Sequence, residues 1–376
     1  MRILSFEVLG LLGRESKIGG PLSSDLNILT GRNGAGKTSL LKLLWYIISG
    51  NILEALREVP FQKATIVTDE YECSVIRLGQ HTCKVELTRP DGPTIVFEDH
   101  YDDDGDPFMN AEDQANTQLM EMGGSVFFPT FRRIEGGFTL GSQQQPSLNT
   151  LSGRTLRSKN PVEEALLALS RKLTNGSHVF VSAISTVDIV GLLLRQYADL
   201  SDIYNRLQQQ TSQEIIETIK AYKADPKDEQ IEIANTVLDD IRLRIEKMEK
   251  DRESIMTPID AVRKVVERLF RYTGIKIGTR LSFGDAASSV NSDALSAGEK
   301  QMLSFICYNA FYKNSVIFID EPELSLHVDW QRQLFSVLQD QQSSNQFIVA
   351  THSPFIYSKY PDKEVSLNID RGDLEG

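Results

Sequence analysis

The sequence has few cysteines, and their spacing excludes the sites that cysteines usually build. Only 3 of the 376 residues are cysteine, at positions 73, 83 and 307. None forms a Cys-x-x-Cys pair, so the sequence indicates neither a zinc ribbon nor a disulfide framework. We predict free, buried thiols, as in proteins of a reducing compartment.

Long apolar runs are also missing. No segment approaches the roughly 18 consecutive apolar residues that a membrane-spanning helix needs, so no membrane partner is predicted. The N-terminus lacks the apolar core and small-residue cleavage site of a signal peptide. Its alternating Ile3, Phe6 and Val8 predict a first strand instead. We therefore expect a cytoplasmic protein.

The sequence has fewer basic than acidic residues. The 40 lysines and arginines stand against 52 acidic residues, a net charge of −12. A protein that coats nucleic acid is usually basic, so any DNA contact must use a local patch. With 40% hydrophobic and 24% charged residues, the composition is that of a soluble globular protein. The length allows one large domain or several ordinary ones.

A glycine-rich loop follows the strand-like run 25–30 and precedes the apolar helical run 39–48. Its sequence, Gly31 to Thr38, has the pattern G-x-x-x-x-G-K-T in the strand–loop–helix context that the motif requires. The glycines let successive N–H groups face a phosphate, and the helix points its positive end there. Lys37 would reach the β- and γ-phosphates, and Thr38 would bind Mg²⁺. The predicted nucleotide-binding residues here are Asn33, Gly34, Ala35, Gly36, Lys37, Thr38 and Ser39.

Two apolar runs near the C-terminus are followed by residues of types that catalyse reactions or bind metals. The run 315–319 leads into Asp320 and Glu321, and the run 346–351 leads into His352. Buried strands with polar residues at their carboxyl ends suit a parallel sheet, whose ligands bind beyond those ends. Asp320 would hold Mg²⁺ through water, and Glu321 would act as general base. His352 would contact the γ-phosphate or the attacking water; a structural histidine is the alternative.

A third segment, 295–301, opens a helix with Ser296 as the expected N-cap. The small residues Ser296, Ala297 and Gly298 allow a phosphate to approach the helix N-terminus. The alternative is a capped amphipathic helix that binds no ligand.

The four motifs GRNGAGKT, LSAGEKQ, VIFIDEPELSLH and ATHS resemble those of the ATP-binding-cassette ATPases. Within this group they are most similar to the AAA-family ATPases of the branch that contains RecF, SMC and OLD proteins. This resemblance implies an α/β P-loop NTPase head, a mixed sheet with an antiparallel flank, and ATP and Mg²⁺ as cofactors. It implies a homodimer in which two heads sandwich two ATPs; the sequence leaves open a larger assembly. In such a dimer, Ser296, Gly298 and Glu299 act on the partner's nucleotide, and His352 is the switch histidine.

Two positions depart from the transporter pattern. His327 stands where other cassettes carry Asp, in an ELSLH form that resembles the OLD and RecF-like branch. The best candidate for the Q-loop is the strand-like segment 126–133, but no glutamine stands at its end, so the residue of the Q-loop is not assigned. Arg132 or Arg133 would substitute for it, unless they are ordinary surface arginines.

Lys37 and Ser296 lie far apart in sequence, so a segment is inserted between the halves of the head. We predict a split head of residues 1–150 and 272–376, and a helical insertion of residues 151–271. Apolar residues at alternating spacings of three and four, among them Leu238 and Ile245, predict an antiparallel helical hairpin there. Thr257 and Pro258 are expected to start a new helix that keeps the same phase. Whether the hairpin projects or packs against the head is open.

The segment 132–172 is basic, with seven basic and three acidic residues. It could contact DNA phosphates in a salt-dependent way, form a solvated loop, or contact an acidic partner protein. The basic residues are Arg132, Arg133, Arg154, Arg157, Lys159, Arg171 and Lys172.

The resemblance extends to the ATPases of Septu, retron and OLD-like anti-phage systems. It implies an ATPase sensor and scaffold that controls a separately encoded effector, a nuclease or toxin. Few residues follow His352, too few for the Toprim domain of OLD nucleases. The alternative is a RecF- or SMC-like clamp that binds DNA in repair or chromosome maintenance.

Overall fold

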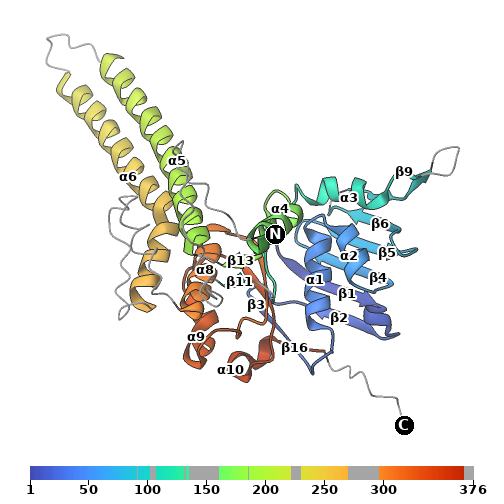
Figure 1. Cartoon of the computed structure of the whole chain (residues 1–376). Coiled ribbons are helices and arrows are strands. Elements are labelled where there is room, and N and C mark those ends of the chain that lie inside the picture. Colours follow the sequence, from blue (N-terminus) through green and yellow to red (C-terminus); the bar gives the residue numbers. More distant parts are fainter. Residues whose placement is uncertain are drawn as a thin grey trace, which may run out of the picture. The chain divides into compact units, whose positions relative to one another are not determined.

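The structure is a computed structural model in which the chain forms two compact units (Figure 1). It describes residues 1–90, 92–101, 107–130, 133–134, 161–184, 186–221, 230–269 and 296–367. The first unit joins Met1–Ser185 to Asp293–Gly376, and the second is Thr186–Ser292. The predicted insertion thus begins earlier in the chain than the second unit does, because the helix α4 (Pro161–Leu173) belongs to the first.

One sheet of the first unit is antiparallel, with strand order β2-β1-β4-β5-β6-β7. Ile3, Phe6 and Val8 of its first strand are all buried, as their alternation predicted. This sheet is the antiparallel flank that the sequence indicated. Its strands are β1 (Ile3–Leu9), β2 (Lys17–Pro21), β4 (Lys63–Thr68), β5 (Glu72–Arg77), β6 (Cys83–Thr88) and β7 (Thr94–Phe97).

The other large sheet is parallel throughout, with strand order β12-β10-β14-β15-β3-β16. Every residue of its β3, β14 and β15 is buried, the pattern expected for strands covered on both faces. These are the apolar runs that precede the sequence motifs. The strands are β3 (Leu26–Thr30), β10 (Ser125–Phe128), β12 (His178–Phe180), β14 (Val316–Asp320), β15 (Gln346–Ala350) and β16 (Glu364–Ser366).

Helix α1 (Lys37–Ile48) lies at the centre of the core. Nine of its residues are buried, and its apolar side chains share one cluster with residues of both sheets. Its Trp45 Nε1 donates to Ser125 Oγ of β10 at 3.0 Å. The other helices of the unit are α2 (Ile52–Glu58), α3 (Ala111–Leu119), α8 (Ala297–Phe311), α9 (Val328–Gln339), α10 (Pro354–Tyr357) and the 3₁₀ turns η1 (Leu11–Gly13) and η2 (Pro361–Lys363). Short strand pairs join β8 (His100–Tyr101) to β9 (Pro107–Met109) and β11 (Arg133–Ile134) to β13 (Ala183–Ile184).

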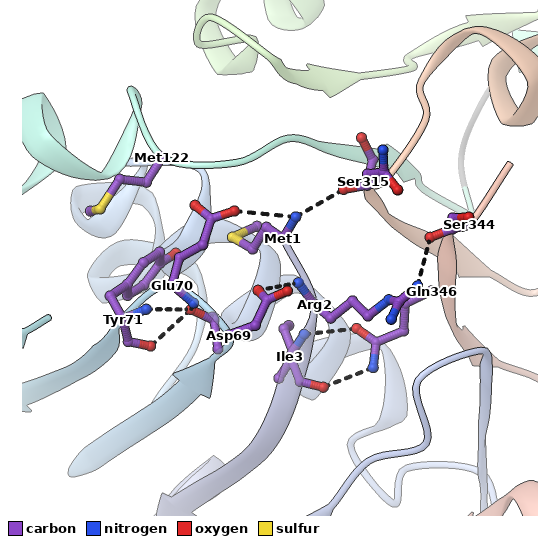
Figure 2. Close-up of polar contacts among 12 residues, drawn as sticks. Met1, Arg2, Ile3, Asp69, Glu70, Tyr71, Met122, Ser315, Ser344 and Gln346 are labelled. Carbon is purple, nitrogen blue, oxygen red and sulfur yellow. Dashed lines mark hydrogen bonds and ion pairs between the residues drawn. The ribbon is translucent and has the colours of Figure 1, made fainter. Parts of the chain in front are cut away.

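The side chain of Gln346 links the two sheets (Figure 2). Its Oε1 accepts from the N–H of Ile3 at 2.8 Å, and its Nε2 donates to the carbonyls of Ile3 and Ser23, both at 2.8 Å. The neighbouring Arg2 N–H donates to Asp69 Oδ1 at 2.7 Å. These bonds fix the start of β1 against the start of β15.

The second unit contains the helices α5 (Thr186–Ala221) and α6 (Gln230–Leu269), which run antiparallel. Arg244 pairs with Glu214 at 2.6 Å, and the guanidinium of Arg252 lies over the Tyr204 ring at 5.7 Å. The predicted hairpin is therefore present. Figure 1 shows the two helices side by side.

Two details of α6 correct the sequence-based prediction. Leu238 and Ile245, expected in the apolar seam, are 63% and 41% exposed, while the preceding Arg244 is less exposed and ion-paired across the hairpin. Pro258 lies inside one continuous helix rather than at the start of a new one. Thr257 Oγ1 bonds the Glu253 carbonyl at 2.8 Å, which reinforces the turn where proline lacks an N–H.

All three cysteines are free and buried, as predicted. Burial raises the pKa of the Cys73 and Cys83 thiols to about 12, so neither is a reactive thiolate at neutral pH. Among the helices that the structure describes, none is long and apolar enough to cross a membrane.

Candidate nucleotide site

Four adjacent strands of the parallel sheet deliver the candidate residues to one edge. In the order β10, β14, β15 and β3, their carboxyl ends lead to Thr130, to Asp320 and Glu321, to His352, and to the glycine-rich loop. Because parallel strands place their carboxyl ends together, residues from four distant segments converge here. The structure thus brings together the loop, the carboxylates and the histidine that the sequence singled out.

The loop after β3 is shaped by glycines and closed by Lys37. Gly34 and Gly36 have φ angles of 80° and 95°, which residues with a Cβ rarely adopt. Lys37 is buried, with 5% of the residue exposed. Its ammonium donates to the carbonyls of Gly31 at 2.9 Å and Arg32 at 3.3 Å. Burial lowers the pKa of Lys37, and the carboxylates beyond β14 oppose this shift.

Arg14 supports the same loop from outside. Its Nη1 and Nη2 donate to the carbonyls of Ala35 at 2.9 Å and Gly34 at 3.0 Å. Asn33 is exposed at the tip of the loop, and Ser39 lies in the first turn of α1. The predicted phosphate-facing residues are therefore on one loop and one helix start.

Asp320 is held by two hydroxyls. Thr38 Oγ1 donates to its Oδ1 at 3.0 Å, and Thr130 Oγ1 donates to its Oδ2. The Asp320 side chain is buried at 1% exposure. The proposed metal ligands Thr38, at the start of α1, and Asp320, at the end of β14, are thus in direct contact, although β15 lies between β14 and the strand β3 that leads to the loop.

Glu321 has a constrained backbone. Its φ of 48° lies in the left-handed region that is uncommon outside glycine, and its N–H donates to the Ala350 carbonyl at 2.8 Å. Burial raises the pKa of the Glu321 carboxyl, and the negative charges of Asp320 and Glu323 add to this. The residue is therefore fixed at the strand end, next to the loop.

His352 follows β15, which lies between β14 and β3 in the sheet. Its Nδ1 is 3.5 Å from the Lys37 ammonium, and its backbone N–H donates to Glu323 Oε1 at 2.7 Å. The histidine is exposed, so a ligand can reach it.

The helix α8 begins as predicted, with Ser296 as N-cap. Ser296 and Glu299 form a capping box, in which each side chain bonds the backbone N–H of the other, at 3.3 and 2.7 Å. Gly298 lies against the loop after β14, where an added Cβ would be 2.4 Å from the Ser325 carbonyl oxygen. In this chain the glycine is therefore needed for an internal contact with this loop, and Ser296 and Glu299 bond each other.

The donors and ligands present fit a nucleotide with Mg²⁺. A hydroxyl and a carboxylate are oxygen ligands of the kind that Mg²⁺ prefers, usually together with phosphate oxygens and water. Within the described ranges, no cluster of three or more His, Cys, Asp or Glu side chains could hold a metal by itself. The buried Lys37 and the glycine-rich loop supply the positive charge that a phosphate needs.

Sequence reasoning missed four residues of this region. Thr130, Arg14, Glu323 and Gln301 each bond a motif residue or its neighbour; Gln301 Nε2 donates to the Pro322 carbonyl at 2.9 Å. Thr130 offered a signal, because it lies within the segment 126–133 in which the Q-loop was sought. Arg132 and the side chain of Arg133 lie outside the described residues.

Two protein-family models match this chain. A family model described as "AAA domain" matches residues 5–265, more than half of the chain, and one described as "AAA ATPase domain" matches residues 196–357. The chain belongs to the AAA domain family. The two matched ranges together include the glycine-rich loop, the carboxylates of Asp320 and Glu321, and His352. A search of curated proteins found no match.

Among solved structures, the AAA chain is similar to an Smc head domain with an extended coiled coil, derived from Pyrococcus furiosus and bound to the C-terminal domain of ScpA. The identity is 14%, the TM-score 0.39, and the match covers 95% of this chain and 91% of that one. A second structure, an SmcHead bound to the C-winged helix domain of ScpA, has 13% identity, a TM-score of 0.38 and the same coverage.

Proposed function

We propose that this chain is an ATPase whose head closes on a second head when both bind ATP and opens after hydrolysis. The observation that carries the proposal is the contact of Thr38 Oγ1 with Asp320 Oδ1 at 3.0 Å, next to the buried Lys37. A P-loop hydroxyl and a strand-end carboxylate meet in this way where Mg²⁺·ATP is held.

Each residue has a defined part in hydrolysis. Lys37 neutralises the β- and γ-phosphates, and Thr38 with Asp320 holds the metal, which, when bound, withdraws charge from the phosphate oxygens. Glu321 orients the attacking water and accepts its proton. His352 contacts the γ-phosphate side of the site from the end of β15. Ser296, Gly298 and Glu299, at the start of α8, face the partner's nucleotide.

Substitution of Glu321 tests this assignment. Glu321→Gln keeps the size of the side chain but removes its basicity. We expect the variant to bind ATP and form dimers, measured by light scattering after gel filtration, while phosphate release falls by at least about 100-fold.

Glu54→Gln is the matched control. Glu54 is partly buried and pairs with Arg57 and Lys172, away from the candidate site, so its loss should leave turnover unchanged. Hydrolysis by Glu321→Gln at the wild-type rate would show that the role given to Glu321 is wrong.

We further propose that the ATPase is the sensor and scaffold subunit of an anti-phage defence complex that controls a separately encoded effector. The segment Glu323–His327 resembles the OLD and RecF-like branch, which fits this role and the alternative clamp alike. The acidic net charge of −12, which does not favour general nucleic-acid binding, supports the defence role over the clamp. Of the basic segment 132–172, Lys172 is already paired with Glu54 at 2.7 Å.

Purification from its native cells, followed by identification of bound proteins, tests this assignment. A nuclease or toxin that co-purifies, and whose activity changes with ATP or with Glu321→Gln, supports it. Salt-sensitive, ATP-dependent DNA binding by the chain alone would instead favour the RecF- or SMC-like clamp.

A further inference from the structure

The carboxylate of Glu323 binds both residues that follow the end of β15. Its Oε2 accepts from Thr351 Oγ1 at 2.8 Å, and its Oε1 accepts from the backbone N–H of His352 at 2.7 Å. Glu323 is half-buried, and Thr351 is buried at 1% exposure. Both carboxylate oxygens are therefore used to hold one short segment.

The hydrogen bonds around Thr351 have fixed directions. The N–H of Ser353 donates to Thr351 Oγ1 at 2.9 Å, so the hydroxyl is an acceptor there and gives its hydrogen to Glu323. An ionised carboxylate needs no donor of its own and accepts both bonds, and such charge-assisted bonds are stronger than neutral ones. The segment 351–353 is thereby held on both sides of His352.

This arrangement fixes the backbone that carries the His352 ring. The ring Nδ1 is 3.5 Å from the Lys37 ammonium, which belongs to the glycine-rich loop, 315 positions away in sequence. A displacement of a reacting group by about 1 Å can cost roughly 100-fold in rate. The bonds from Glu323 thus act on the residue that reaches the γ-phosphate side of the site.

We propose that Glu323 is a positioning residue for ATP hydrolysis, whose carboxylate holds Thr351 and His352 so that the His352 ring stays beside Lys37. The proposal rests on the proposed ATPase function. It gives the loop after β14 a second role, because Asp320 and Glu321 serve the metal and the water, whereas Glu323 places the histidine of the next strand.

The chemistry of the two bonds explains why an amide cannot replace the carboxylate. A glutamine offers one acceptor oxygen and one NH₂ group, so its oxygen can replace only one of the two carboxylate oxygens, and either the His352 N–H or the Thr351 hydroxyl hydrogen loses its acceptor. Aspartate keeps both acceptors but is shorter by one methylene, about 1.5 Å. Glutamine should therefore break the arrangement, and aspartate should preserve part of it.

A double-mutant cycle between Glu323 and His352 tests the proposal with the full chain. We expect Glu323→Gln to lower kcat for Mg²⁺·ATP by about 10- to 100-fold, with the Kd for ATP within about twofold of wild type. In a His352→Ala background the same substitution should have no further effect on kcat, because the ring that Glu323 places is gone.

Glu364→Gln is the matched control. Glu364 accepts from Thr30 Oγ1 at 2.5 Å in the same sheet but touches neither Thr351 nor His352 in the described structure. It should leave kcat unchanged in both backgrounds. Thermal unfolding of each variant checks that the fold is retained.

The outcomes are distinct. If Glu323→Gln lowers kcat by the same factor with and without His352, Glu323 does not act through the histidine and the proposal is wrong. If Glu323→Gln does not fold, the same cycle with Glu323→Asp decides between these results. Absence of hydrolysis by the wild-type chain would instead overturn the proposed ATPase function.

Discussion

The side-chain amide of Gln346 and the backbone of Ile3 form a reciprocal pair of hydrogen bonds, each 2.8 Å long (Figure 2). The pair connects β15 of the parallel sheet with β1 of the antiparallel sheet. A third bond from the same amide reaches the Ser23 carbonyl.

Truncation of Gln346 should therefore weaken the whole first unit. Gln346→Ala leaves the buried N–H and C=O of Ile3 without these partners, so we expect a loss of about 3 kcal/mol in the free energy of unfolding. Urea unfolding measures it. Gln114→Ala, which removes only bonds of 3.3 and 3.4 Å at the surface, should cost less than about 1 kcal/mol.

Removal of the Thr130 hydroxyl should affect the metal. Thr130→Val takes away one of the two hydroxyls that hold Asp320, so its carboxylate is less well oriented. We expect the Mg²⁺ concentration for half-maximal ATPase activity to rise about 10-fold. Thr65→Val, which breaks a hydroxyl pair with Ser74 in the antiparallel sheet, is the control. An unchanged Mg²⁺ dependence in Thr130→Val would contradict this role.

Gly298 and Gly191 should respond oppositely to alanine. A Cβ at Gly298 would lie 2.4 Å from the Ser325 carbonyl oxygen, whereas at Gly191, in α5, it would meet nothing within 4 Å. Gly298→Ala must shift backbone and should reduce both thermal stability and ATPase activity. Gly191→Ala should stabilise its helix by up to about 1 kcal/mol. Equal behaviour of the two variants in thermal unfolding would refute the contact.

His178 should make the stability of the first unit depend on pH. Its Nε2 lies 3.1 Å from the Met122 carbonyl and so carries hydrogen, and its Nδ1 accepts from Ser125 Oγ at 2.8 Å. Burial lowers the pKa of His178 to about 4. The unfolded chain, with a pKa near 6.5, takes up a proton first, so stability is full above about pH 6.5 and falls toward pH 4.

Between pH 7 and pH 5 this group alone should cost about 2 kcal/mol of unfolding free energy. Urea unfolding of wild type and His178→Gln at both pH values measures the difference. The variant should lose that part of the pH dependence. A slope identical to that of wild type would mean that the pKa of His178 is the same in the folded and the unfolded chain.

Much of the parallel sheet and its site could be predicted from sequence because apolar runs end directly in reactive residues. Asp320 and His352 each follow such a run, Thr38 follows the glycine-rich loop after another, and the structure places all three at one edge. Thr130 and Glu323 could not be assigned in this way. Their roles depend on which strands are neighbours, and strand order is set by tertiary packing rather than by local pattern.

The helical hairpin shows the same limit. The three-and-four spacing predicted two paired helices, and α5 and α6 are present. The spacing did not determine which residue of each helical turn lies at the contact between α5 and α6. Arg244 takes a position that the pattern gave to Ile245, since its ion pair with Glu214 is available only once the partner helix is in place.

The strand order has a consequence for synthesis of the chain. β3, which carries the glycine-rich loop, pairs in the described sheet with β15 and β16, whose residues follow it by more than 300 positions. At about 5–20 residues per second, the ribosome needs on the order of 15–60 seconds to make that intervening stretch. The antiparallel sheet, whose strands are near neighbours in sequence, can form in this interval. The glycine-rich loop is therefore synthesised well before either strand that pairs with β3, and the parallel sheet that positions it can be completed only after β15 and β16 have been made.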